Sequence, residues 1–178
     1  MPTSAKRKGS PELSKNLDVF LNVPYDGPFT NLLLAYGAGL VALGLTPRTS
    51  LEIPRGAARR DKITDLIGGC SHSVHDLSRV ELDLNDPPNP SLNMSCELGI
   101  VVGLHRKRQA NHTWFVFEAS ERRLKKSLSD LADTDPYIHQ GTPGWCPQRA
   151  HECFHPVAAA TERATDGARL RVAGGVIG

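Results

Sequence analysis

The chain has 178 residues, of which 39% are hydrophobic and 22% charged, which predicts one domain with a substantial core. Its formal net charge of +2, with scattered basic residues, does not indicate a nucleic-acid-binding surface. The four cysteines are unevenly spaced and no hydrophobic signal peptide precedes the first apolar run, so we expect a cytoplasmic protein without a membrane span.

Apolar periodicity and turn residues predict alternating strands and helices. The expected elements, in chain order, are strand 17–23, helix 29–44, strand 48–53, helix 60–70, strand 72–77, helix 91–103, strand 113–117, helix 120–134 and edge strand 137–139. This alternation predicts an α/β fold in which helices cover both faces of a parallel sheet. Right-handed crossovers favour a doubly wound, flavodoxin-like sheet of about five strands in the order 2-1-3-4-5.

Three regions are expected along the chain. Residues 1–16 are rich in Ser, Lys and Pro and predict a disordered leader. Residues 17–143 would form the folded domain, and residues 144–178, which have little apolar periodicity, a poorly ordered tail. In a doubly wound sheet, ligands bind at the carboxyl ends of the strands, so polar residues there are the candidates for a site.

One acidic residue, Glu97, interrupts the apolar helix predicted at 91–103. Asn93 lies four residues earlier, on the same face, and could hold a ribose. The helix dipole would keep the carboxylate ionised, which suits attack on an anomeric carbon or stabilisation of an oxocarbenium ion. Gly99 and Gly103 are expected to let the helix approach the sheet closely. The alternative is that Glu97 only pairs with an arginine such as Arg79.

A second polar cluster follows the third predicted strand. Asp76 could accept hydrogen bonds from two sugar hydroxyls, with Ser78 beside it, and Arg79 could bind a phosphate. The alternative is an ordinary Asx turn in which Ser78 caps a helix or loop. His75 is expected to pack within the sheet and to be structural.

The loop after the first strand offers a third group. Asn22, Tyr25 and Asp26 would lie beside the crevice, where the tyrosine could stack on a nucleobase and its neighbours bind a ribose. The alternative is a plain Pro-Gly turn. Arg60, at the start of the second helix, could face a phosphate or only solvent.

The chain lacks the motifs of several cofactor classes. It has neither a G-x-G-x-x-G segment after the first strand nor a Walker loop. Near the C-terminus, two cysteines and two histidines have a spacing that matches no usual zinc pattern: Cys146, His151, Cys153 and His155. No metal or redox cofactor is therefore expected.

Four segments together resemble small bacterial nucleotide-binding proteins of the TIR-like and nucleoside-deoxyribosyltransferase-like superfamily. They read VFLNVPYD, RRDKI, SVHDLSRVE and NMSCELG, and the resemblance covers residues 17–143. It implies a Rossmann-like domain that binds a nucleoside or NAD-like ligand. It also implies that Glu97 is catalytic, that Asp76 binds the sugar and that Tyr25 lies at the base. Ser95 and Cys96 depart from the proline and bulky apolar residue more usual in the family.

The resemblance favours an N-glycoside-cleaving or base-exchanging enzyme, a hydrolase or transferase acting in stress or antiphage defence. The alternative is a non-catalytic nucleotide-sensing module that signals by self-association as a homo-oligomer. No membrane or nucleic-acid partner is expected in either case. The tail departs from the amphipathic helix of the family, which suggests an out-of-frame extension over 144–178; the gene sequence tests this hypothesis.

Overall fold

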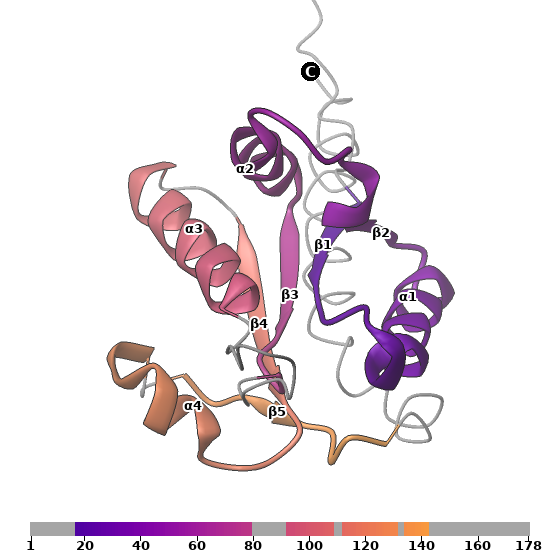
Figure 1. The fold of residues 1–178 in the computed structure, drawn as a ribbon, viewed down its shortest axis with the longest axis vertical. Coiled ribbons are helices and arrows are strands. Elements are labelled where there is room, and N and C mark those ends of the chain that lie inside the picture. The colour runs from indigo at the N-terminus through magenta and orange to yellow at the C-terminus, as the bar shows by residue number, and fades with distance from the viewer. Residues whose placement is uncertain (1–16, 80–91, 109–111, 132–133, 143–178) are drawn as a thin grey trace, which may run out of the picture.

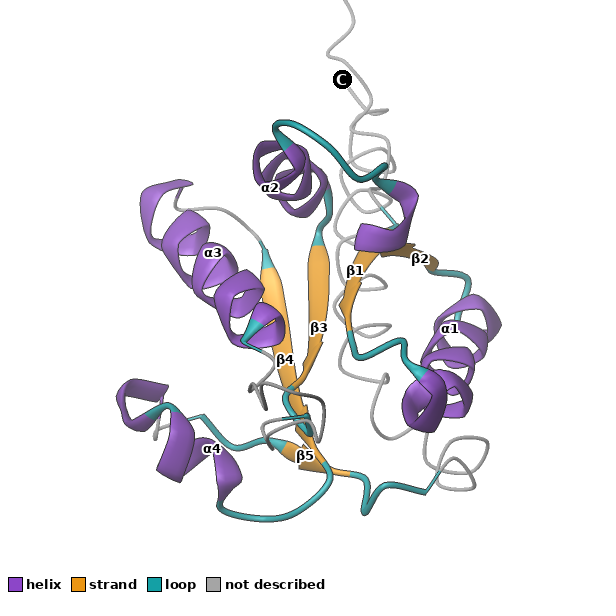
Figure 2. Ribbon diagram, viewed as in Figure 1, coloured by secondary structure: helices purple, strands orange, loops and turns teal. Residues whose placement is uncertain are grey.

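A computed structural model describes residues 17–79, 92–108, 112–131 and 134–142 (Figure 1). The strands are β1 (Asp18–Asn22), β2 (Thr46–Thr49), β3 (His72–Asp76), β4 (Thr113–Glu118) and β5 (Tyr137–Ile138). The α-helices are α1 (Thr30–Ala42), α2 (Arg59–Gly69), α3 (Asn93–Arg108) and α4 (Arg123–Ser127). Short 3-10 turns lie at Gly27–Phe29, Ser50–Glu52 and Ser129–Leu131. Figure 2 shows how strands and helices alternate along the chain.

The five strands form one parallel sheet in the order β2-β1-β3-β4-β5. The predicted flavodoxin-like α/β fold and strand order are therefore confirmed. Figure 1 shows α1 on one side of the sheet and α2 and α3 on the other. The direction of winding changes between β1 and β3, so the crevice expected to bind ligands opens at the carboxyl ends of those two strands.

Each face of the sheet buries its own apolar cluster. On the α1 face, α1 contributes Leu32, Tyr36 and Leu40, which pack against Val19, Leu21, Val74 and Phe117 of the sheet. On the opposite face, α2 and α3 contribute Ile63, Ile67 and Val101, which pack against Phe20. Alternate residues of β1 thus face opposite sides, as the two-residue period of a strand requires.

A glycine ends α1 where the sequence predicted. Gly44 has a φ of +71°, a left-handed conformation that glycine adopts without strain. Its N–H donates to the carbonyl of Val41, and the N–H of Leu45 donates to that of Leu40. This pair of bonds is a Schellman motif, which satisfies the last carbonyls of α1 and directs the chain into β2.

Several predicted boundaries differ from the structure. The second strand occupies 46–49 instead of 48–53, because Ser50–Glu52 forms a 3-10 turn closed by a capping box from Thr49. The third helix continues past Gly103 to Arg108, and the predicted helix 120–134 is only the short α4 followed by a 3-10 turn. A Cβ at Gly99 or Gly103 would meet nothing within 4 Å, so the expected close approach to the sheet was wrong.

Some predictions fall outside the described residues. These are the leader at 1–16, the tail at 144–178 with its frame hypothesis, and the group Cys146, His151, Cys153 and His155. Within the described part of the chain, no helix is long and apolar enough to cross a membrane. Nor do three or more His, Cys, Asp or Glu side chains gather there as candidate metal ligands.

Candidate functional site

A small recess, open to solvent, lies at the carboxyl ends of β1 and β2. The recess is shallow, and its empty volume of about 240 Å³ includes open solvent. The lining residues come from β1 and the loop after it, from α1, from the end of β2 and from the start of α3: Leu21, Asn22, Val23, Tyr25, Leu33, Thr49, Ser50, Leu51 and Met94. Tyr25 is 46% exposed, so its ring is available for stacking.

Asn22, the last residue of β1, bridges the point where the winding direction changes. Its Nδ2 lies 2.8 Å from Nδ1 of His75 on β3 and 2.8 Å from the carbonyl oxygen of Met94 on α3. Both contacts are buried, and together they tie β1, β3 and α3 at the crevice. Its Oδ1 is also buried and has no hydrogen-bond partner among the described residues.

The contact with His75 continues as a chain of hydrogen bonds under α2 and α3. Nε2 of His75 lies 2.9 Å from Oγ of Ser73, which lies 3.0 Å from Nε2 of His112. Nδ1 of His112 lies 2.9 Å from the carbonyl oxygen of Cys70. Burial, with a smaller effect of His112, lowers the pKa of His75 to about 3, so this ring is neutral near pH 7. The expectation that His75 packs within the sheet is confirmed.

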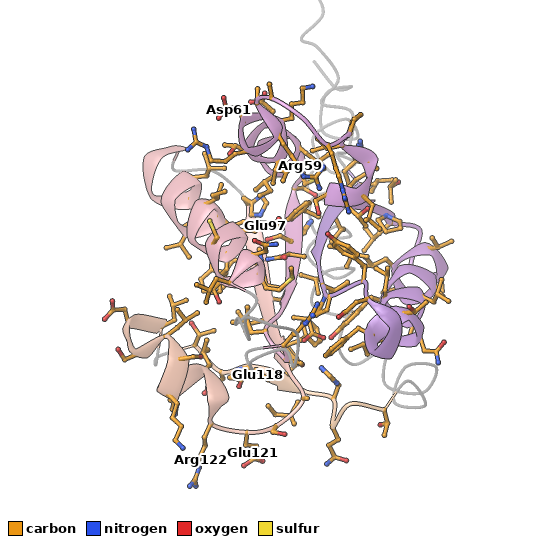
Figure 3. All side chains as sticks on the ribbon, in the orientation of Figure 1. Arg59, Asp61, Glu97, Glu118, Glu121 and Arg122 are labelled. Carbon is orange, nitrogen blue, oxygen red and sulfur yellow. The ribbon has the colours of Figure 1, made fainter. Side chains whose placement is uncertain are left out.

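Glu97 lies one turn into α3 and points toward the sheet, near Arg59 (Figure 3). Burial raises the pKa of Glu97 to about 7, and the charge of Arg59 opposes that rise only in part. From the sequence we expected the helix dipole to keep this carboxylate ionised. Its pKa is instead raised, because the desolvation that comes with burial has the larger effect. No ion pair among the described residues includes Glu97. Arg79, the alternative partner that the sequence suggested, pairs with Asp26 instead.

The charge that lowers the pKa of Glu97 comes from Arg59, which the sequence did not single out. Its guanidinium donates hydrogen bonds to the backbone carbonyls of Ile53 and Ser50, so the turn after β2 holds it in place. Ser50 lines the recess, which brings a fixed positive charge close to it. The RRDKI segment marked this helix start, but the sequence pointed to the neighbouring Arg60.

Asp76 is fully buried on the α1 face of the sheet. Its Oδ2 accepts a hydrogen bond from the Tyr36 hydroxyl at 3.0 Å and lies 3.1 Å from Nε2 of His139, while Oδ1 accepts from the Ser78 N–H at 2.9 Å. The Ser78 hydroxyl also lies 2.9 Å from Nε2 of His139. The Asx-turn alternative therefore describes Asp76 and Ser78, and a sugar hydroxyl would have to displace one of these internal contacts.

The remaining predicted residues are dispersed. Arg79 forms an ion pair with Asp26 at 2.6 Å, which joins the loop after β3 to the loop after β1. Arg60 lies at the surface and pairs with Asp61 at 3.3 Å. Asn93 is exposed at the first position of α3. The crevice therefore gathers Asn22, Tyr25 and the start of α3, whereas Asp76 and Ser78 lie on the other face of the sheet.

Comparisons with known proteins add little to this geometry. No family model matches the chain, and no curated protein matches it. The chain is similar to a solved structure of diflavin flavoprotein A3 from Nostoc sp., with 15% sequence identity and a TM-score of 0.48. That match covers 83% of this chain and 96% of the flavoprotein chain. The fold assignment rests on the strand order described above.

Proposed function

We propose that the protein cleaves or exchanges the N-glycosidic bond of NAD or a nucleoside, with Glu97 as the catalytic carboxylate. The observation that carries this proposal is a carboxyl with no ion-pair partner in the described part of the chain, at the start of α3, with its pKa raised to about 7. Such a group costs stability, and carboxyls with strongly perturbed pKa values are frequent at active sites.

The chemistry that we assign to Glu97 depends on its ionised form. In hydrolysis, the C1′–N bond breaks and its electron pair leaves with the base, while water adds to C1′ and releases a proton. The carboxylate would stabilise the positive charge that develops on the ribose. With a pKa of about 7, a comparable protonated population is present near neutrality and can protonate a leaving base that needs it.

The recess provides the binding part of the proposal. Tyr25 would stack on the base, Asn22 would meet one edge of the ligand, and Asn93 at the first turn of α3 would reach the ribose. Arg59, and not Arg60 or Arg79, would bind a phosphate, because two backbone carbonyls hold its guanidinium beside the recess. We assign Asp76 a supporting role and not a contact with the sugar.

The direct test compares wild type with Glu97→Gln. The proteins are incubated with NAD and with a panel of nucleosides, and free nicotinamide or base is measured by chromatography. Loss of a nucleophile or charge stabiliser costs several kcal/mol of barrier, so turnover should fall by about a hundredfold or more. Glu121→Gln is the matched control, since Glu121 is exposed. If wild type and Glu97→Gln release product equally, the catalytic assignment is wrong.

One observation favours a second candidate, a nucleotide-sensing module that acts by self-association. Leu34 and Val41 are 64% and 61% exposed on α1 and lie seven residues apart, nearly on one helical face. An exposed apolar stripe of this kind suits contact with a second copy. Tight nucleotide binding without turnover, together with a larger sedimentation coefficient when nucleotide is added, would favour this candidate over the enzyme.

A further inference from the structure

The amide group of Asn22 can adopt only one orientation. The Met94 carbonyl oxygen can only accept a hydrogen bond, so the atom 2.8 Å from it must be Nδ2. A flipped amide would set two carbonyl oxygens against each other in a buried position. Because the same Nδ2 also contacts Nδ1 of His75, both of its hydrogens are used within the protein.

The hydrogen bonds beyond Asn22 fix the same orientation independently. The Cys70 carbonyl can only accept, so Nδ1 of His112 donates to it and Nε2 of His112 accepts from the Ser73 hydroxyl. Oγ of Ser73 then accepts from Nε2 of His75, which leaves Nδ1 of His75 to accept from Asn22. Every donor in this chain meets an acceptor in one consistent direction, from the Cys70 carbonyl back to Asn22.

Only the Asn22 oxygen is left to meet a ligand. Oδ1 is buried and has no partner among the described residues, and Asn22 lines the recess. A buried acceptor without a donor is costly, and a ligand that supplies one recovers that cost. A ligand that presents a carbonyl oxygen at this point would instead set two acceptors against each other.

We propose that Asn22, held by the Ser73–His75–His112 chain, selects ligands whose base presents an exocyclic amine to Oδ1, as adenine and cytosine do, over ligands with a carbonyl oxygen in that position. This inference rests on the proposed nucleotide site and specifies the ligand class that the site accepts. His75 and Ser73 are positioning residues, since they act on the ligand only through the orientation of Asn22. Keto-bearing counterparts, such as hypoxanthine and uracil, are discriminated against.

The test measures dissociation constants of the wild-type chain for matched pairs that differ in this one group. The probes are AMP against IMP, CMP against UMP, and NAD against its hypoxanthine analogue, by calorimetry at one ionic strength. We expect the amine-bearing member to bind at least about tenfold more tightly in the pair whose base occupies the recess. Equal binding within every pair overturns the selection by Asn22 but leaves the nucleotide site standing. If no probe binds, the proposed function and this inference both fail.

Two variants test the positioning role. His75→Phe removes one of the two acceptors of Nδ2, so the Met94 carbonyl alone holds the amide and the preference within a pair should fall. Ser73→Ala is a milder change that keeps the ring and should reduce the preference partially. A purely structural role would weaken both members of a pair equally and leave their ratio unchanged, which would overturn the positioning role. Nitrogen NMR of the unliganded protein adds a check without substitution, since Nε2 and not Nδ1 of His75 must carry the proton.

Discussion

The ionised Glu97 carboxylate should lower the stability of the folded chain near neutral pH, where the proposed reaction uses that ionised form. Its pKa rises from 4.5 to about 7 because burial disfavours the charged form. A raised pKa means that the folded chain holds a proton that the unfolded chain releases, so stability is present below pH 4.5 and is lost as the pH rises toward 7. That rise corresponds to an upper limit of about 3 kcal/mol, and screening at a partly exposed side chain reduces it to about 1–2 kcal/mol.

Glu97→Gln removes this penalty, because glutamine does not ionise. We expect the variant to be more stable than wild type by about 1–2 kcal/mol at pH 8 and nearly equal to it at pH 4.5, measured by urea unfolding. The exposed Glu121→Gln control should show no such dependence on pH. If Glu97→Gln is instead less stable than wild type at pH 8, Glu97 serves as an ordinary ion-pair partner and burial is not the dominant effect.

Three further predictions follow from the buried contacts and the ion pairs. Asp76→Asn should lower the unfolding free energy by about 2–4 kcal/mol, since it breaks a fully buried network, while the exposed Asp65→Asn should change little in urea unfolding. Because the pKa of His75 is lowered to about 3 in the folded chain, stability should fall by about 1.4 kcal/mol per pH unit below pH 6.5. A His75 ring that titrates near 6.5 by NMR would refute this. Arg79→Ala should lower the unfolding free energy by less than about 1 kcal/mol, because the side chains of its ion pair with Asp26 are about one-third exposed. A larger loss would mean that this pair is needed to hold the loops after β1 and β3 together.

Much of the fold could be predicted from the sequence because its signals are local. Apolar runs at Leu17–Val23 and around Phe115, helical spacing in α1, and Gly44 as its end all depend on periodicity or on the conformational freedom of one residue. Boundaries were less predictable where tertiary contacts decide them. The capping box at Thr49 shortens β2, and Gly103, although a poor helix former, does not end α3.

The site was less predictable because its geometry depends on long-range pairing. The order of Asp76 and Glu97 along the chain does not reveal that they face opposite sides of the sheet. His139, 63 residues after Asp76 in the chain, was expected only as part of an edge strand, yet it supplies a buried contact to that carboxylate. The side chains of Arg59 and Arg60 leave α2 in different directions, and no local motif specifies this difference.

The contact between Asp76 and His139 links the last described strand to the loops beside the recess. His139 follows β5 and reaches the Asx turn that begins the loop after β3, and that loop carries Arg79. Arg79 in turn holds Asp26 beside Tyr25. The position of β5 at the sheet edge is thus linked to the Tyr25 ring at the recess through two buried contacts and one surface ion pair. A change at the edge strand is therefore expected to alter the affinity for the proposed nucleotide without touching any residue that lines the recess.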